Sequence, residues 1–400
     1  MKRSPLLNAT LRWFLLAMIL ANVASEMYFS LLAVYLAELG ASVGQVGLVF
    51  SLAAIVPLAL QIFGGWLSDS IGRLRTIAIG AAVASLGYVL LPLAPTWQWA
   101  ILALALEYVS GSMVGPSFSA FIAEQSSEET RGRVFGISKG IFLTVAVIGP
   151  VLGGFLAQRY GFRLMLAVAA GLYVTAAILR IWMATALRFD GGRAAERPTL
   201  RSLRTSLGSM FTMLVAGGLV TWLLITDGVR DVAYGLCYNL EPLYMAQAGS
   251  LDAQQIGALN SVRGIGLVVA SLLAGWLSDR LGERRVILAG LALQCAGLLL
   301  FVRTTAFGGF AAAVAVQGLG FGTMIPAYDS LVSKAIPEKL RGVAFGLFGA
   351  SIGLISLPAP WLGARLWELT TPQTPFVVTA LILLACTAPV WRKFVLREES

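Results

Sequence analysis

Five acidic side chains lie inside long apolar stretches of the sequence, namely Glu26, Glu107, Asp227, Asp231 and Asp329. A charge at the centre of a bilayer costs about 2.5–3.5 kcal/mol on insertion scales, so these groups must face water or one another. Such carboxylates can take up and release protons or exchange a proton for a cation. The chain contains no histidine, so a proton relay must use carboxylates, and we expect no metal site.

The elements that position these acids must be membrane helices. Charged residues make up only 12% of the 400 residues and hydrophobic residues 58%, against a usual charged share of about 25%, so no soluble globule could bury the apolar surface. Twelve stretches are long enough to span a bilayer. They begin near Leu11, Val43, Leu74, Trp97, Gly132, Phe162, Leu214, Leu251, Arg285, Phe307, Gly342 and Pro375. We predict an all-α integral membrane protein.

The distribution of the 29 lysines and arginines predicts the topology. With the amino terminus inside, most of them, Arg180 included, fall in inner loops, as the positive-inside tendency requires. Both termini are therefore expected in the cytoplasm, in a plasma (inner) membrane. This composition argues against a nucleic-acid partner, and the absence of a P-loop or a nucleophile–base arrangement argues against ATP hydrolysis, enzymatic catalysis and a cofactor.

The chain repeats itself at an offset of 210 residues. The sequence Gly-Trp-Leu-Ser-Asp occurs at residues 65–69 and again at 275–279, and Pro116 pairs with Pro326 and Pro150 with Pro360. The repeat predicts two homologous six-helix bundles, at residues 1–187 and 214–400. The polar residues 188–213 are predicted to form a cytoplasmic linker.

The repeated motif resembles the loop signature that follows the second span in the major facilitator superfamily, and both copies are followed by Glu-x-x-Arg-Gly two spans later. The resemblance implies that fold, with inner and outer cavities between the halves, alternating access, a small-molecule substrate and a monomer. The glycines suit close helix approach and positive-φ turns, and the charges suit inner-loop ion pairs, so we interpret this set as a conformational latch. Its residues are Gly65, Asp69, Gly72, Arg73, Arg131, Gly275, Asp279, Gly282, Arg284 and Arg341.

Four of the acids, Glu26, Glu107, Asp227 and Asp231, are proton-coupling candidates. The resemblance implies that spans 1, 4, 7 and 10 line the transport path; the first three carry these acids and span 10 carries Asp329. In span 7 the helical period places Asp227, Arg230, Asp231, Tyr234, Tyr238, Glu241 and Met245 on one stripe. Alternatively, Asp227 and Arg230 form a structural pair, and Arg263 bonds to Asp231. Because only Arg230 and Arg263 oppose the four acids, Glu26 and Glu107 are the expected unpaired carboxylates.

The remaining cavity candidates are mostly aromatic, soft or amide side chains, which suit an amphipathic or cationic substrate. They are Asn22, Phe29, Arg230, Tyr234, Tyr238, Arg263, Gln317, Met324 and Tyr328. Each could equally be ordinary core packing.

The direction of transport is suggested by span 5, where Gly149, Pro150, Gly153 and Gly154 resemble a Gly-Pro-x-x-Gly-Gly signature of drug/proton antiporters. The same residues could simply allow close packing and bending of the helix. Together these features predict a proton-coupled exporter of small amphipathic or cationic compounds. The alternatives are a proton-coupled symporter or lipid flippase for an anionic substrate, and a non-transporting membrane sensor.

Overall fold

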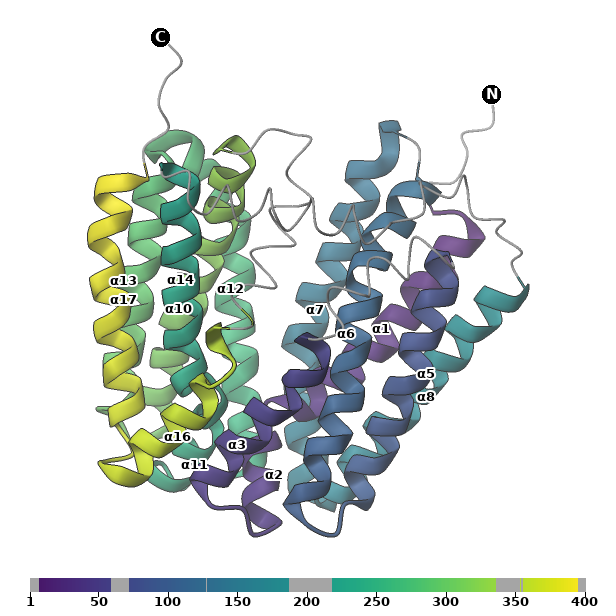
Figure 1. Cartoon of the computed structure of the whole chain (residues 1–400), viewed down its shortest axis with the longest axis horizontal. Coiled ribbons are helices and arrows are strands. Elements are labelled where there is room, and N and C mark those ends of the chain that lie inside the picture. The colour runs from purple at the N-terminus through teal and green to yellow at the C-terminus, as the bar shows by residue number, and fades with distance from the viewer. Residues whose placement is uncertain are drawn as a thin grey trace, which may run out of the picture. The chain divides into compact units, whose positions relative to one another are not determined.

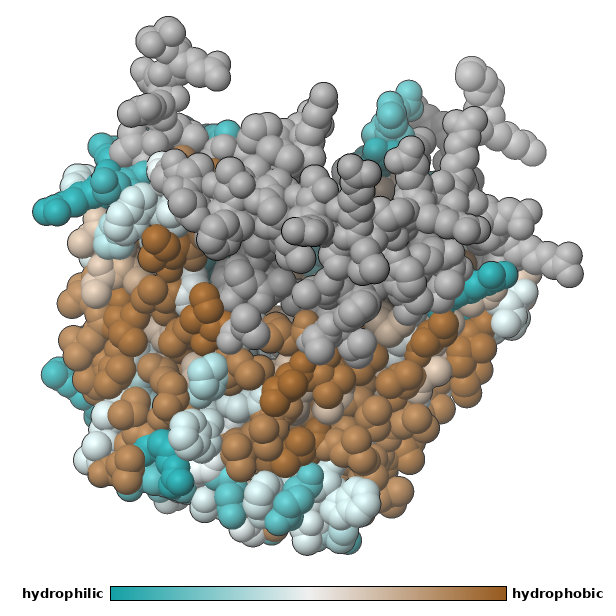
Figure 2. Space-filling view, in the orientation of Figure 1, coloured by the Kyte–Doolittle hydropathy of each residue, from teal (hydrophilic) through white to brown (hydrophobic). Residues whose placement is uncertain are grey.

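The computed structural model describes residues 7–58, 72–126, 128–186, 218–335, 353 and 355–394, and every regular element in these ranges is helical. Eight of the described helices are long and apolar enough to cross a membrane. Hydrophobic residues cover the sides of the helices and hydrophilic ones gather at their ends (Figure 2). This pattern fits helices whose sides face lipid and whose ends face water. The predicted linker lies outside the described residues.

The chain divides into two compact units (Figure 1). Unit 1 comprises residues 1–41 and 52–199, and unit 2 comprises residues 42–51 and 200–400. The helices of unit 1 are α1 (Ala9–Phe29), α2 (Leu32–Glu38), α5 (Arg73–Leu93), α6 (Trp97–Gln125), α7 (Glu128–Tyr160) and α8 (Phe162–Ala186). Residues 42–51 form most of α3 (Val43–Ala53), and this short helix groups with unit 2, which the sequence repeat did not predict.

Unit 2 repeats the helix pairing of unit 1. Its other helices are α10 (Leu219–Cys237), η1 (Tyr238–Leu240), α11 (Glu241–Ala248), α12 (Ala253–Leu281), α13 (Glu283–Phe301), α14 (Phe307–Ala335), α16 (Ala359–Leu369) and α17 (Thr374–Lys393). In unit 1, α5 packs on α6 and α8, and α1 on α7 and α8; in unit 2, α13 packs on α14 and α17, and α10 on α16 and α17. The same helix pairing in both units is expected if each half is a copy of one six-helix bundle.

The first and seventh spans are broken, although the sequence suggests continuous helices. The α1 helix ends at Phe29 and α2 begins at Leu32, while α10 gives way at Tyr238 to the single turn η1 before α11. The break removes Glu241 and Met245 from the straight stripe predicted for span 7. Both side chains are instead buried, at 3% and 0% exposure.

Close helix contacts in each unit depend on glycines that the sequence pairs across the repeat. A Cβ on Gly153 of α7 would lie 2.5 Å from the Met27 carbonyl carbon, and one on Gly363 of α16 would lie 2.5 Å from that of Leu236. Both contacts are with backbone atoms of a neighbouring helix. Only a residue without a side chain lets α7 and α16 approach α1 and α10 this closely.

Candidate functional site

The centre of unit 1 holds a buried carboxyl surrounded by tyrosines. Glu107 of α6 is 6% exposed and accepts a hydrogen bond from the hydroxyl of Tyr28 on α1. The Tyr28 ring meets Tyr88 of α5 edge-on at 5.7 Å between centroids, and Tyr88 stacks on Tyr173 of α8 at 4.0 Å. The Tyr173 hydroxyl donates to the Ser110 hydroxyl at 2.8 Å. Four helices therefore converge on one acid.

The acid in this group has no cationic partner among the described residues. Its Oε2 atom is bonded to Tyr28, and its Oε1 atom is buried without a hydrogen-bond partner. An ionised carboxylate here would be a buried charge without a counter-ion, whereas a protonated one is neutral. This agrees with the sequence argument that Glu107 is an unpaired acid.

Arg180 was missed as a site residue, because the sequence places it with the inner loops. In the structure α8 continues to Ala186, and Arg180 is 3% exposed inside unit 1. Its guanidinium donates to the Met18 sulfur at 3.4 Å and lies over the Tyr173 ring at 5.9 Å, and its Nε has no hydrogen-bond partner among the residues that the structure describes. A buried arginine held by an aromatic ring and a thioether is a third intramembrane cation, which the sequence charge count did not include.

The span 5 motif packs against the second candidate carboxylate. A Cβ on Gly149 of α7 would lie 3.2 Å from the backbone carbonyl carbon of Glu26 on α1. Pro150, Gly153 and Gly154 are buried in the same helix, and the Glu26 side chain is partly exposed. The packing interpretation of the motif thus has direct support, and it fixes α7 beside an acid-bearing turn of α1.

The two other unit 1 candidates are less informative. Asn22 donates its side-chain amide to the Met18 carbonyl of its own helix at 2.8 Å, and Phe29 is half-buried at the end of α1. Their role in a substrate cavity stays a prediction.

The charged groups of unit 2 form two separate ion pairs. Arg230 binds Asp227, three residues earlier on α10, which confirms the structural pair considered above. Arg263 of α12 binds Glu241 at the start of α11. The predicted bond from Arg263 to Asp231 is therefore wrong, because the break at η1 folds Glu241 back toward α12. Asp231 itself is half-buried on α10.

The aromatic and soft residues of unit 2 surround these ion pairs. Arg230 also donates to the Met324 sulfur at 3.6 Å and lies over the Tyr328 ring at 5.2 Å. The Tyr328 hydroxyl donates to the Leu223 carbonyl at 2.5 Å. Arg263 lies over the Tyr238 ring at 5.5 Å.

Two polar groups close to this set have no partner. The Tyr234 hydroxyl and the Gln317 amide nitrogen are buried without hydrogen bonds among the described residues. Tyr234 packs on the Phe321 ring, with 4.9 Å between centroids. The contacts described for these side chains lie inside unit 2, and their role in binding stays a prediction.

Seven of the ten latch residues lie in the part of the chain that the structure describes. Gly65, Asp69 and Arg341 lie outside the described residues, and Arg131 is exposed on α7. Gly72 and Gly282 have φ of +94° and +81° at the starts of α5 and α13, as the short-turn argument predicts. Gly275 is exposed, and a Cβ there would meet no described atom within 4 Å, so the close helix approach expected for this copy stays a prediction.

The latch charges pair locally within each unit. Arg73 bonds Glu124 of α6 at 3.3 Å. Arg284 donates to the Trp391 carbonyl of α17 at 3.3 Å, and Asp279 is exposed at the end of α12. Glu283 at the start of α13 binds Lys334 of α14. This ion pair joins α13 to α14 beside the latch residue Gly282.

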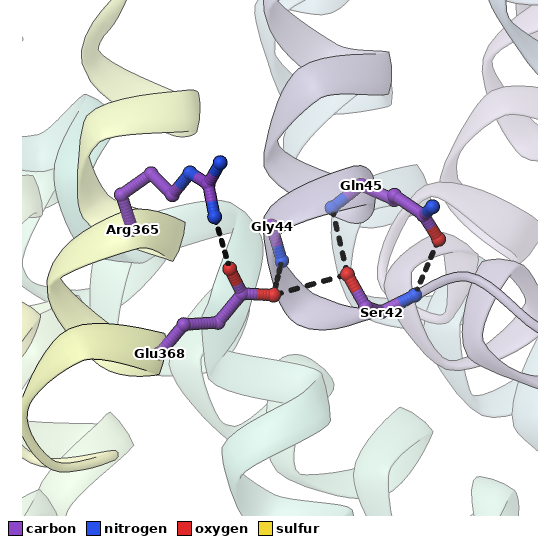
Figure 3. Close-up of polar contacts among 5 residues, drawn as sticks. All are labelled: Ser42, Gly44, Gln45, Arg365 and Glu368. Atoms are coloured by element: carbon purple, nitrogen blue, oxygen red, sulfur yellow. Dashed lines mark hydrogen bonds and ion pairs between the residues drawn. The ribbon is translucent and has the colours of Figure 1, made fainter.

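At the opposite end of unit 2, α3 is fixed to α16 by a carboxylate that sequence analysis missed (Figure 3). One oxygen of Glu368 accepts the Gly44 N–H at 2.6 Å and the Ser42 hydroxyl at 3.0 Å, and the other accepts Arg365 at 3.0 Å. Burial raises the pKa of Glu368, but these three donors outweigh it and hold the pKa below its usual value. The Ser51 hydroxyl accepts the Trp361 N–H at 3.2 Å farther along the same contact.

Two similar units of long apolar helices with buried ionisable groups in each define a multi-pass integral membrane protein. The family model of the Major Facilitator Superfamily matches residues 14–229 and 231–400. The chain belongs to the major facilitator superfamily, which makes a small-molecule substrate and a membrane lipid environment part of its function.

Curated relatives of similar length carry transporter names. Multidrug resistance protein MdtG of Yersinia enterocolitica is 26% identical over 388 residues, covering 94% of this chain and 90% of the relative. A Na(+), Li(+), K(+)/H(+) antiporter of Planococcus maritimus is also 26% identical, covering 89% of this chain and 91% of the relative. The crystal structure of the nucleoside transporter NupG superposes with a TM-score of 0.79 at 15% identity, covering 97% of this chain and all of that one, which supports the fold alone.

Proposed function

We propose that the protein is a proton-coupled antiporter that exports small amphipathic or cationic compounds, with Glu107 as its principal coupling carboxylate. The observation that carries the proposal is the buried Glu107 carboxyl, bonded to Tyr28 and without a cation among the described residues. Relatives named for multidrug resistance and for cation/proton antiport support the same class of transport.

Protonation of Glu107 changes what its site can bind. The ionised carboxylate offers a negative charge next to the aromatic rings of Tyr28, Tyr88 and Tyr173, an environment that suits an organic cation. The protonated acid is neutral and loses that attraction. Proton and substrate therefore compete for one charge, and a proton taken up from outside displaces a substrate delivered from inside.

The other acids have secondary roles in this proposal. Glu26 lies at the α1–α7 contact and is partly exposed, so it is a second site of proton exchange. Asp231 is half-buried and lies one residue after Arg230, whose guanidinium already binds Asp227. We assign Asp227 to structure and Asp231 to the substrate path. The protein works as a monomer with both termini in the cytoplasm.

A second candidate function is exchange of alkali cations for protons. The observation that favours it is the Planococcus maritimus relative, whose printed name includes Na(+), Li(+) and K(+). The same unpaired carboxyl would serve, because a small cation and a proton also compete for one negative charge.

The test is proton release in inverted membrane vesicles from cells without their own drug pumps. Vesicles acidified by respiration receive a lipophilic cationic dye, sodium chloride or potassium chloride, and a pH-sensitive fluorophore reports alkalinisation. Wild type, Glu107→Gln, Tyr28→Phe and the control Glu129→Gln are compared; Glu129 is an exposed acid in the first turn of α7.

The proposal expects the dye to discharge the proton gradient in wild type and in Glu129→Gln. In Glu107→Gln the discharge should be at least tenfold slower. In Tyr28→Phe the discharge should occur with an altered pH dependence. A response to alkali salts alone selects the second candidate. A response that Glu107→Gln leaves intact refutes the assignment of this residue, and no response to any cation refutes both candidates.

A further inference from the structure

A basic pocket lies at the end of unit 2 that the sequence places at the cytoplasmic surface. It encloses about 450 Å³ where α12 ends and α13 begins, and its lining includes Arg280, Arg284, Arg285, Leu331 and Phe394. The turn at Gly282 brings the arginines on either side of it to one opening. Two of its lining residues, Gly282 and Arg284, belong to the latch set, but neither the proposed transport cycle nor the latch requires a ligand in this pocket.

The pocket is positively charged because its single lining acid is already engaged. Glu283 is 7% exposed and is bound by the Lys334 ammonium and, at 3.0 Å, by the Ser330 hydroxyl. None of the three lining arginines forms an ion pair with a carboxylate in the part of the chain that the structure describes. Asp279 is the nearest acid in sequence, and it lies outside the lining. The arginines are thus available to an anion.

Tryptophans place these arginines at the depth of the membrane interface. The Arg280 guanidinium lies 4.4 Å from the ring centroid of Trp276, and that of Arg284 lies 4.5 Å from Trp391. Both rings are about half exposed, at 53% and 54%. Exposed tryptophans at the ends of membrane helices mark the level of lipid headgroups.

An apolar surface continues from the pocket along α12. Leu272, Trp276 and Arg280 follow one another at four-residue spacing, so they share one side of the helix. Leu272 is 75% exposed and Leu273 53%, which is the pattern of a surface that contacts acyl chains. A free phosphate ion would make no favourable contact with these leucines, whereas a phospholipid would contact the arginines with its headgroup and the leucines with its acyl chains.

We propose that this pocket binds the phosphate headgroup of an anionic glycerophospholipid, with its acyl chains along the exposed side of α12. Arginines favour phosphate because their planar donors match its oxygens, and basic pockets between membrane helices at the cytoplasmic side take such headgroups. Since Arg284 also holds α17 through the Trp391 carbonyl, a bound lipid fastens α12, α13 and α17 together.

The experiment measures lipid binding by the full-length protein, purified and delipidated in a neutral detergent. Dioleoyl phosphatidylglycerol, dioleoyl phosphatidylcholine and inorganic phosphate are titrated separately, with native mass spectrometry counting bound lipid and thermal unfolding reporting stabilisation. The variants are Arg280→Gln/Arg285→Gln, Arg280→Lys/Arg285→Lys and the control Arg303→Gln. Arg303 is an exposed arginine just past the opposite end of α13.

The proposal expects wild type and Arg303→Gln to bind phosphatidylglycerol at least tenfold more tightly than phosphatidylcholine. The double glutamine variant loses this preference, the double lysine variant keeps most of it, and millimolar phosphate does not compete. Equal binding of the two lipids by wild type overturns the proposal without reference to any variant. An unchanged preference in the double glutamine variant overturns this location, and competition by free phosphate overturns the lipid as occupant.

Discussion

The close approach of α7 to α1 at Gly153 makes a quantitative prediction about a single methyl group. Alanine at this position would bring its Cβ to 2.5 Å from the Met27 carbonyl carbon, about 1 Å less than the 3.4 Å at which ordinary contact begins. The obstacle is backbone, so no side-chain rotation relieves it, and α7 must move away from α1. Overpacking of this kind costs about 1–3 kcal/mol.

Gly140 on the same helix provides the matched control. A Cβ there meets no described atom within 4 Å, so Gly140→Ala should stabilise by the helix propensity difference, about 1 kcal/mol. In detergent, at about 2–4 °C per kcal/mol for a unit of this size, Gly153→Ala should unfold about 2–12 °C below wild type and Gly140→Ala about 2–4 °C above it. Equal midpoints for the two variants would refute the argument that the α1–α7 contact requires glycine.

Two further predictions concern charges of unit 2. Glu241→Ala leaves Arg263 as a buried unpaired charge and should destabilise the protein by about 3–5 kcal/mol. The double variant Glu241→Gln/Arg263→Gln removes both charges and should cost much less. A loss of thermal stability in the double variant as large as the sum of the losses in the two single variants would contradict this. Glu368 has a lowered pKa, so its contribution is present above its unfolded value and is lost as pH falls through its folded value. The thermal stability advantage of wild type over Glu368→Gln should therefore shrink below about pH 4.5. An advantage that stays constant down to pH 3.5 would count against a stabilising role for the ionised Glu368.

Much of the fold could be predicted from apolar length and from the 210-residue repeat, because membrane helices must be long and apolar and duplicated sequences pack alike. The break at Ser30–Leu31 could not, since the residues around it are as apolar as a continuous helix would be, whereas the break at η1 has a signal in the sequence, because Pro242 directly after Glu241 favours the start of a new helix. A helical period that continues through Tyr238 predicts Glu241 on the stripe of α10 and leaves Asp231 as the partner of Arg263, whereas in the structure Arg263 binds Glu241.

The candidate site was predictable where a charge stands alone and unpredictable where partners come from distant helices. Glu107 is conspicuous in an apolar run, but nothing in the sequence pairs it with Tyr28. Arg180 lies near a span end, where a snorkelling arginine is ordinary, so its burial depends on packing that sequence does not show. From the sequence Glu368 is indistinguishable from an ordinary loop acid, because its partner Gly44 is 324 residues away and meets it only through the packing of α3 on α16.

The bond between Glu368 and the Gly44 N–H has a consequence for how the two repeats can diverge. Its donor is a main-chain group, so only proline at position 44 would remove the donor, but any other side chain would place a Cβ 2.5 Å from the carboxylate. The 210-residue offset places Gln254 opposite Gly44 and Gln158 opposite Glu368. The equivalent pair, Gln158 of the first copy and Gln254 of the second, thus has neither the acid nor the glycine, so this contact has no counterpart elsewhere in the repeat.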